Sequence, residues 1–517
     1  MDLTFPKLLP LYLAGDVRCM DQATIKGPGV SGIDLMERAG KSAFELIRQI
    51  RPEATTLSAV AGQGNNGGDA YIVARLAIEA GWDVSVYPSI ASPRSTGDAG
   101  LALERFKAAG GRVLDFIPED FEGAEVLVDG LFGTGLNREV DGSDAAIIGA
   151  VNRYKARGLS QPINRRTVLA LDLPSGLDAD SGRLHGCAVE ADHTLTFLVA
   201  KPGLFTGMGP SRAGQVHLAD LGMESELRRA YVPRAFLMEW PPRKPLPRGR
   251  ETHKGHFGHV LIIGGSPGFS GAAMLAGEAA ARVGAGLVSI GTHPNIAGSI
   301  GQNRAELMVH GISEKQDLTR LMEKASVIAI GPGLGTSQWA RTLLEEALEA
   351  TCPLVLDADA LKLLADMPKQ QKNWVLTPHP GEAALMLGVD SRTVQNDRYD
   401  AISQLLKDFG GTCVLKGSGT LIGTSGEPLR VGSTGNPGMA SGGMGDVLTG
   451  VIAGLIAQGM SPSEAAASGV MLHGAAADLA VQADGERGLI ASDLFPCLRK
   501  LINYPNLLQC QMPCVIL

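Results

Sequence analysis

One glycine-rich stretch near the C-terminus limits what this chain can fold into. Residues 441–450 read SGGMGDVLTG, and an apolar run, Val451 to Ile456, follows directly. A glycine turn that opens into a helix leaves several backbone N–H groups unpaired, and these point at one spot beside the positive end of the helix dipole. The stretch therefore predicts a phosphate-binding turn at the start of a helix.

Asp446 lies in the first turn of this predicted helix. A carboxylate beside a bound anion costs electrostatic repulsion, which points to a chemical role for the side chain. The role we infer is removal of the proton from a hydroxyl group that attacks the phosphate. The alternative is that Asp446 only caps the helix, as Asp commonly does.

Size and composition narrow the class of protein. With 517 residues the chain exceeds what a single core usually supports, so two or three domains are expected. Its 67 glycines and 5% aromatic residues are typical of an α/β protein that handles nucleotides through tight strand-to-helix turns. The net charge of −8 argues against nucleic acid and acidic membranes as partners.

The cysteines and the termini bear on location. Seven cysteines are scattered without a CxxC pair, a pattern that favours reduced thiols. The N-terminal residues lack the apolar length and basic flank of a signal peptide, and no run approaches membrane-spanning length. We therefore expect a cytoplasmic protein without a membrane partner. The last four residues, CVIL, formally match a prenylation box, but no basic segment precedes them.

The first half begins with a predicted βαβ unit. A buried strand is expected over 56–61, a turn over 62–69, a helix over 70–80 and a second strand over 82–87. The turn reads GQGNNGGD, which matches neither the dinucleotide GxGxxG pattern nor a Walker A loop. Its glycines allow close backbone approach and its polar side chains suit a ligand. The candidate residues are Asn65, Asn66, Gly67, Gly68 and Asp69.

Two further predicted strands, 125–128 and 168–171, run into Asp129 and Asp172. In a parallel sheet both carboxylates reach the carboxyl edge, where ligands collect. Polar loops follow, GLFGTGLNREV after Asp129 and LPSG with Ser175 after Asp172. We interpret these loops as one shared site, although each Asp could instead close a local turn. Strands over 191–201 and 215–221 are expected to be the last of this half.

The second half repeats the strand, turn and helix pattern after a proline-rich basic segment, PPRKPLPRGR, that reads as a linker. Its first unit is predicted as strand 259–263, turn GGSPGFSG, helix 272–283 and strand 285–292. Later strands lead into polar turns: 327–330 into GPGLGT, 354–356 into Asp357 and Asp359, 374–376 into TPHPGE with His379, and 413–415 into KGSGT. The alternation in both halves predicts two α/β domains, joined as a fusion because their loop motifs differ.

Several of these motifs together resemble one family. AGQGNNGGD and LDLPSGLD resemble the NAD(P)H-hydrate epimerase domain. HKGHFGHVLIIGG, GPGLG, LDADAL, TPHPGE, KGSGT and GGMGDVLTG resemble the ADP-dependent NAD(P)H-hydrate dehydratase domain. Both sets occur in this order in the bifunctional NAD(P)H-hydrate repair enzymes. Only the extreme C-terminus, NYPNLLQCQMPCVIL, falls outside the resemblance.

The resemblance implies a fold and an activity. It implies a Rossmann-like three-layer sandwich joined to a ribokinase-like domain. The implied segments are an epimerase domain over 1–225, a linker over 226–252, a dehydratase domain over 253–505 and an unassigned tail over 506–517. The implied substrates are the hydrated cofactors NADHX and NADPHX. The first domain would interconvert their R and S forms, and the second would dehydrate the S form while ADP becomes AMP and phosphate.

The resemblance also implies site residues. In the epimerase domain the hydrate would contact Asn65, Asn66, Gly67, Gly68, Asp69, Gly133, Thr134, Gly135, Leu136, Asn137, Arg138, Glu139 and Asp172, and potassium would lie at Asn66, Asp129 and Ser175. In the dehydratase domain the hydrate would contact Ala272, Gly333, His379 and Asp446, and the nucleotide would contact Lys416, Gly417, Ser418, Gly419, Thr420 and Gly445. Mg²⁺ with the nucleotide and a homo-oligomer are further expectations.

Two catalytic residues follow from this reasoning, and two alternatives stay open. Asp172 is our candidate to act in turn as acid and base during epimerisation, and Asp446 is our candidate to activate the hydrate's hydroxyl toward ADP. A ribokinase-like fold also serves kinases of small alcohols, such as vitamin precursors or sugars. The first domain could also be a binding module without catalysis.

Overall fold

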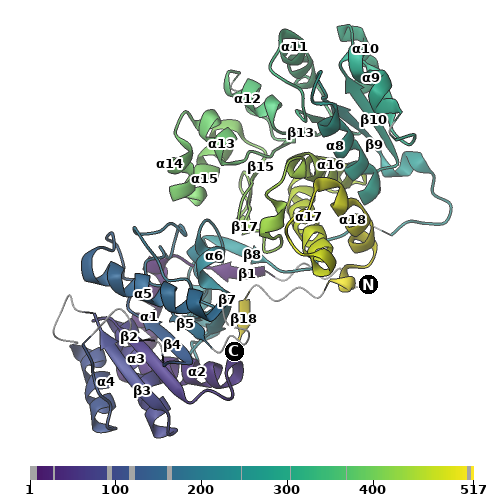
Figure 1. Ribbon diagram of the computed structural model, residues 1–517. Helices are drawn as coiled ribbons and strands as arrows, with labels where there is room; N and C mark the ends of the chain where they lie inside the picture. Colours follow the sequence, from purple (N-terminus) through teal and green to yellow (C-terminus); the bar gives the residue numbers. More distant parts are fainter. Residues whose placement is uncertain are drawn as a thin grey trace. The chain divides into compact units, whose positions relative to one another are not determined.

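The computed structural model describes residues 8–26, 30–89, 96–115, 121, 123–159, 166–245, 247–302, 304–367, 369–508 and 514–517. The chain divides into two compact units (Figure 1). One comprises Pro10–Ala235 with Met512–Leu517, and the other comprises Met1–Leu9 with Phe236–Gln511. Both units alternate strands and helices, which confirms the expected α/β class with two domains. The segment bounds implied by the resemblance stay predictions.

The N-terminal unit is a parallel α/β sandwich. Its strands are β2 (Thr56–Ala61), β3 (Asp83–Pro88), β4 (Val126–Gly130), β5 (Thr167–Leu171), β6 (His193–Phe197), β7 (Gln215–Ala219) and β18 (Cys514–Ile516). Its helices are α1 (Ala14–Lys26), α2 (Gly32–Ile50), α3 (Asn65–Glu79), α4 (Gly97–Ala108), α5 (Gly142–Leu159), η1 (Pro202–Leu204), α6 (Gly209–Ala213) and α7 (Ser225–Arg229). The sheet order is β18-β7-β6-β5-β4-β2-β3, and its registered pairs are parallel.

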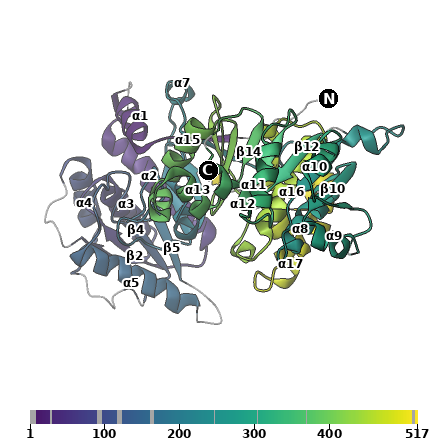
Figure 2. The same cartoon turned by 90° about the horizontal axis from the view of Figure 1, so that it is seen from above.

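Helices cover both faces of this sheet. In Figure 2, α5 lies on one side of the strands, and α3 and α4 lie on the other. Each face has its own apolar core, one built from α2, α3 and α4 against the sheet and one built from α5 against it. Central strands such as β2 and β5 are buried almost throughout and mainly apolar because both of their faces are covered. This architecture agrees with the expected Rossmann-like three-layer sandwich.

The start of α3 differs from the sequence prediction. We expected a turn over 62–69 and a helix from Ala70, but α3 already begins at Asn65. Gly67 and Gly68 permit this, since a Cβ atom at Gly67 would collide with the Gly62 backbone and one at Gly68 would lie 2.5 Å from the Met36 sulfur. The polar residues Asn66 and Asp69 therefore stand in the first two turns of a helix rather than in a loop.

The C-terminal tail supplies a strand that the sequence did not predict. Residues 215–219 form β7, within the predicted strand 215–221, but the sheet continues with β18, which pairs in parallel with β7 in the register Cys514↔Val216 and Ile516↔Leu218. The Leu517 N–H also donates to the Leu218 carbonyl at 2.9 Å. Cys514 is only 2% exposed in this pairing.

The C-terminal unit is built on a larger sheet. Its strands are β8 (Ala235–Met238), β9 (His259–Ile263), β10 (Leu287–Thr292), β11 (Met308–Gly311), β12 (Val327–Ile330), β13 (Leu354–Leu356), β14 (Trp374–Leu376), β15 (Thr412–Leu415), β16 (Leu421–Thr424) and β17 (Leu429–Val431), with β1 (Leu8–Leu11) at one edge. The order is β1-β8-β17-β16-β15-β14-β13-β12-β9-β10-β11. Pairs from β15 to β11 are parallel, whereas β15, β16 and β17 pair antiparallel.

The helices of this unit help to position the residues of its candidate site. They are η2 (Lys254–Phe257), α8 (Ser270–Val283), α9 (Pro294–Gly301), α10 (Lys315–Met322), α11 (Gln338–Ala347), α12 (Asp359–Ala365), α13 (Pro380–Leu387), α14 (Ser391–Asn396), α15 (Arg398–Phe409), η3 (Pro437–Met439), α16 (Met444–Ala457), α17 (Pro462–Asp484), η4 (Ala491–Asp493), α18 (Leu494–Asn503) and η5 (Pro505–Leu507). One core joins α8, α16, α17 and α18 to the sheet. Almost every residue of α16 is buried, as its largely apolar sequence requires. Within the described part of the chain, no helix has the length and apolar character that a membrane crossing needs.

Deletion of residues 512–517 tests the pairing of β18 with β7. We expect amides of residues 216–218 that point to β18 to exchange with solvent about 10- to 100-fold faster, because each lost backbone hydrogen bond is worth about 1 kcal/mol. The measurement is hydrogen exchange on the full chain against the deletion. Ile516→Ser is the control, because its side chain is 57% exposed and its backbone pairing survives. Unchanged exchange in the deletion would contradict the pairing.

Candidate functional sites

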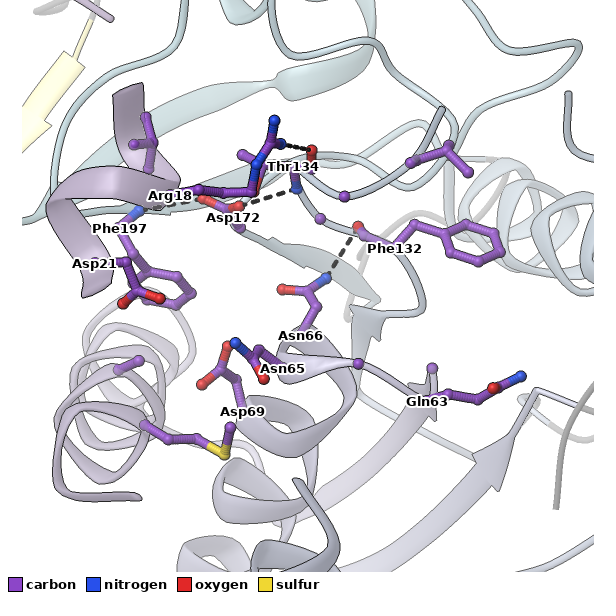
Figure 3. Close-up of a pocket in the computed structure, with 18 of the residues that line it drawn as sticks. Arg18, Asp21, Gln63, Asn65, Asn66, Asp69, Phe132, Thr134, Asp172 and Phe197 are labelled. Atoms are coloured by element: carbon purple, nitrogen blue, oxygen red, sulfur yellow. Dashed lines mark hydrogen bonds between the residues drawn. The ribbon is translucent and has the colours of Figure 1, made fainter. Parts of the chain in front are cut away.

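The N-terminal unit holds a cavity of about 610 Å³ at the carboxyl ends of its central strands (Figure 3). The loop after β2, the loop after β4 and the residue after β5 all reach it, as the parallel topology predicts. It brings together the predicted residues Asn65, Asn66, Asp69, Gly133, Thr134, Gly135, Leu136, Asn137, Arg138 and Asp172. Of the other candidates, Gly67 and Gly68 serve the packing of α3, and Glu139 lies beside Gly186.

Asp172 is held in a strained position by a buried lysine. Its backbone φ is +61°, a left-handed conformation that is uncommon outside glycine. Oδ1 accepts a hydrogen bond from Lys201 Nζ at 2.6 Å, and Oδ2 accepts one from the Thr134 N–H at 3.4 Å. Lys201 is fully buried, and its ammonium also donates to Thr196 Oγ1 and to the Phe197 carbonyl. The carboxyl group is thereby fixed in orientation at the cavity wall.

Further carboxyl groups line this cavity, among them those of Asp69 and Asp21. Burial raises the pKa of Asp69 well above its usual value, and the nearby charges of Asp172 and Asp21 raise it further. Burial and the charge of Asp172 also raise the pKa of Asp21, which comes from α1. When burial and neighbouring charges raise the pKa of some carboxyl groups at one cavity, one group can act as the acid and another as the base.

A cluster of oxygen atoms lies behind the cavity. Asp129 is fully buried at the end of β4, where its Oδ1 accepts from Ser175 Oγ at 2.6 Å and its Oδ2 accepts from the Ser175 N–H at 2.8 Å. Burial raises the pKa of Asp129 to about 6, against these hydrogen bonds, which lower it. Asn66 donates through Nδ2 to the Phe132 carbonyl, while its buried Oδ1 has no hydrogen-bond partner among the described atoms.

Sequence reasoning missed much of the lining of this cavity, including the charged residues Arg18, Asp21 and Lys201. Arg18 and Asp21 lie on α1, and Arg18 Nη1 donates to the Thr134 carbonyl at 3.2 Å (Figure 3). This helix lies about 30 residues before the first predicted strand, 56–61, and its sequence carried no motif that linked it to the site. Lys201 closes the predicted strand 191–201, and a lone lysine at the end of an apolar run was the available signal.

In the C-terminal unit, a buried ion pair connects the predicted nucleotide turn to the sheet. Lys416, which follows β15, places Nζ 2.7 Å from Oδ1 of Asp357, which follows β13. Thr449 of α16 donates to Asp357 Oδ2 at 2.8 Å. The pKa of Lys416 is raised, because the charges of Asp357 and Glu382 outweigh its burial. The pKa of Asp357 is lowered, because Lys416 and the hydrogen bonds outweigh its burial.

Asp446 stands beside this ion pair. It lies in the first turn of α16, as predicted, after Gly443, whose φ of +88° ends the glycine turn. Burial, followed by the negative charge of Asp357, raises the pKa of Asp446 to about 7, although Lys416 opposes the shift. A Cβ atom at Gly445 would lie 3.3 Å from Lys416 Nζ, so the two predicted nucleotide contacts adjoin each other.

His379 reaches the same cluster through Glu382. It caps α13, where its Nδ1 accepts hydrogen bonds from the N–H groups of Gly381 and Glu382. Its Nε2 lies 3.3 Å from Glu382 Oε1, and Glu382 Oε2 lies 3.8 Å from Lys416 Nζ. The imidazole is half-exposed, so it is open to a ligand. Glu382 is nearly buried and was absent from the predicted set, although it belongs to the TPHPGE motif.

The remaining candidates of this unit lie close by. A Cβ atom at Gly333 would lie 3.1 Å from the Ala272 side chain, which brings these two predicted substrate contacts together. Gly443 approaches Leu275 of α8 and so joins that pair to the glycine turn. Behind the turn of Lys416, Gly417, Ser418, Gly419 and Thr420, the buried guanidinium of Arg398 donates to the carbonyls of Leu415 and Lys416.

Comparisons with known proteins match both halves of the chain. A family profile described as NAD(P)H-hydrate dehydratase matches residues 260–500, and one described as YjeF-related protein N-terminus matches residues 32–203. The bifunctional NAD(P)H-hydrate repair enzyme Nnr of Coxiella burnetii is 44% identical over 497 residues, which cover 95% of this chain and 99% of that relative. The Escherichia coli enzyme of the same name is 39% identical over 499 residues, or 95% and 94% of the two chains.

A solved structure also resembles the C-terminal unit. The ADP/ATP-dependent NAD(P)H-hydrate dehydratase from Bacillus subtilis, co-crystallised with ATP and Mg²⁺, is 32% identical with a TM-score of 0.45. The match covers 50% of this chain and 94% of that protein.

Fold and sites define a two-domain enzyme, a Rossmann-like domain fused to a ribokinase-like domain, with an ionic cluster at the strand ends of each. The chain belongs to the family of bifunctional NAD(P)H-hydrate repair enzymes. Membership confirms the expected combination of an epimerase domain and a dehydratase domain. It also decides against the two alternatives, a kinase of small alcohols and a first domain without catalysis.

Proposed function

We propose that the C-terminal site dehydrates the S hydrate of NADH or NADPH by capturing its hydroxyl group with a phosphoryl group of ADP. The hydroxyl oxygen bonds to the terminal phosphorus while the bond to AMP breaks. Loss of phosphate together with a ring proton then restores the double bond, so the oxygen of water leaves within phosphate. The observation that carries this proposal is the carboxyl group of Asp446, with a pKa of about 7, at the mouth of a glycine-rich helix start.

The residues of the cluster take separate roles in this step. Asp446 accepts the proton of the attacking hydroxyl. The N–H groups of the turn at Gly445 and the ammonium of Lys416 hold the charge that develops on the phosphate. Asp357 positions Lys416, since its carboxylate is fully engaged by Lys416 and Thr449. His379 is the proposed contact to the hydrate because its imidazole is half-exposed beside Glu382.

The described residues contain no group of three or more His, Cys, Asp or Glu side chains that could hold a metal ion, so the proposed Mg²⁺ would enter with the nucleotide near Asp446. Asp359 and Glu382 both act on Asp446 electrostatically, and carboxylate oxygens are the ligands that Mg²⁺ prefers. When bound, the ion would neutralise charge on the phosphates. Excess EDTA is expected to abolish nucleotide-driven dehydration, and full activity in EDTA would contradict this assignment.

Replacement of Asp446 tests the dehydratase proposal. We expect Asp446→Ala to lower dehydration by about 10²- to 10⁴-fold, the usual contribution of a general base, with epimerisation unchanged. Because the base acts in its ionised form, the wild-type rate should rise with pH through about 7 and level off above it. Recovery of reduced-cofactor absorbance measures the rate, with Asp484→Asn, an exposed carboxylate on α17, as control. Loss of both activities together would contradict two separate sites.

For the N-terminal cavity, we propose epimerisation by departure and return of water at the hydroxyl-bearing ring carbon. An acid protonates the hydroxyl, water leaves with help from the ring nitrogen, and a base takes a proton from the water that adds on the other face. Asp172 is the proposed base, oriented by Lys201. Asp69 extends our single-carboxyl hypothesis as the proposed acid, because its burial and the charges of Asp172 and Asp21 raise its pKa and so favour its protonated form.

Replacement of Asp172 and Lys201 tests this assignment. Asp172→Asn is expected to slow exchange of the R and S hydrates by at least about 100-fold. Lys201→Met should lower the exchange rate too, because the carboxyl group loses its orienting partner. Exchange is followed chromatographically without ADP, with Asp83→Asn, an exposed carboxylate of β3, as control. A wild-type exchange rate in Asp172→Asn would overturn the assignment.

A potassium ion fits the oxygen cluster behind the cavity. Asn66, Asp129 and Ser175 are the proposed ligands, and the orphaned Asn66 Oδ1 gains a partner in this way. A bound cation would favour the ionised form of Asp129 and would help to orient the loop after β4. Exchange of K⁺ for Li⁺ is expected to lower the unfolding temperature of the N-terminal unit. An identical temperature in both salts would contradict the site. A homo-oligomer and a cytoplasmic location stay predictions from the sequence.

A further inference from the structure

A second cavity lies in the C-terminal unit away from the dehydratase residues. It has a volume of about 740 Å³ and is lined by the C-terminal ends of α8 and α16, by α18, and by Lys244, Pro245, Pro247 and Arg248 of the proline-rich segment. The sequence analysis treated that basic segment only as a linker. Here its residues form one wall of the cavity, which is a use that the proposed repair reactions do not explain.

The lining of this cavity is strongly basic in a protein of net negative charge. It has five cationic side chains and two carboxylates, an excess of three positive charges, whereas the whole chain carries −8. The cationic residues are Lys244, Arg248, Arg282, Arg304 and Arg499, and the acidic residues are Glu278 and Glu306. Such a concentration of charge raises the local density of anions.

A buried carboxylate fixes two of the arginines. Glu278 of α8 is 7% exposed. Its Oε1 accepts from Nε and Nη2 of Arg282 at 3.2 and 3.0 Å, and its Oε2 accepts from Nε of Arg304 at 2.7 Å. The guanidinium group has five N–H donors, so this pairing leaves other N–H groups of both arginines for a ligand. Two guanidinium groups that are held in fixed orientations in this way match the geometry of phosphate oxygens.

The other cations are placed to complete an anion site. Arg248 stacks on the Phe257 ring at 3.8 Å and donates to the Gly284 carbonyl, which offsets the negative end of α8. Neither Lys244 nor Arg499 forms an ion pair with a residue that the structure describes. Both are exposed at the cavity wall. Apolar lining comes from Pro245, Pro247, Val283, Leu307 and Ile502.

We propose that this cavity binds a small phosphorylated molecule with at least two phosphate groups on an apolar body. The phosphates would lie against Lys244, Arg304 and Arg499, and the body would lie against the prolines. This site is separate from the catalytic cluster, because Asp446 lies in the first turn of α16 whereas Gln458, the residue after the end of α16, lines the cavity. Fourteen helical residues place these ends about 20 Å apart. The proposal is thus independent of the chemistry assigned to Asp446.

The test is calorimetric titration of the full-length protein with inorganic pyrophosphate. In Lys244→Gln/Arg499→Gln, affinity is expected to fall at least tenfold, while epimerisation and dehydration keep wild-type rates. The matched control is Arg320→Gln/Lys324→Gln, which removes two exposed positive charges outside the cavity and should bind as wild type does. Orthophosphate should bind at least tenfold more weakly than pyrophosphate.

The possible results separate the proposal from its competitors. Pyrophosphate that binds only at the glycine turn of α16 would titrate identically in wild type and in Lys244→Gln/Arg499→Gln, and this would overturn the proposal. Absence of binding to the wild type, or an equal loss in the control, would also overturn it. Equal affinity for orthophosphate would reject a ligand with two phosphates. Because Lys244 and Arg499 have no ion-pair partners among the described residues, their replacement leaves the fold intact.

Discussion

The buried ion pair between Lys416 and Asp357 holds the C-terminal site together. Removing two charges from water is costly, and the cost is met only when the remaining oxygens and protons find partners. Here Thr449 of α16 satisfies the second Asp357 oxygen, and Glu382 supplies a further negative charge beside Lys416. One pair thus ties together the ends of β13 and β15 and the helix that carries Asp446. The burial of Asp446 and the nearby negative charge of Asp357 raise the pKa of Asp446.

The N-terminal site also contains an ion pair with a buried lysine, formed by Lys201 and Asp172. Lys201 is fully buried and satisfied by Asp172, Thr196 and the Phe197 carbonyl. In both sites a non-glycine residue at a strand end adopts positive φ, Asp172 at +61° and Ala358 at +49°. Such conformations cost about 1–3 kcal/mol and persist where the surroundings enforce them. In each site the residue with positive φ turns the chain sharply at the sheet edge, and the turn brings a carboxyl group to the site.

The sequence predicted the elements around the sites well because local signals coincided there. The predicted strands 56–61, 259–263 and 327–330 agree with the observed bounds, since each is an apolar run closed by a glycine turn. The short antiparallel strands β16 and β17 were missed, because runs of four and three residues carry little periodicity. The helix start at Asn65 was missed because NNGG reads as a turn unless the packing that requires its glycines is known.

By itself the sequence determined the alternation of strands and helices, the glycine turns, the residues Asp129, Asp172, His379 and Lys416 at or just after strand ends, and Asp446 at a helix start. These depend on spacing and local chemistry, which neighbouring residues encode. Only the tertiary structure decided that Lys201 faces Asp172, that Glu382 joins His379 to Lys416, and that the tail pairs with β7. It also turned a basic linker into the wall of a cavity. Such contacts join residues that are distant in the chain. They are selected by the free energies of burial and of strand pairing, which local sequence patterns do not encode.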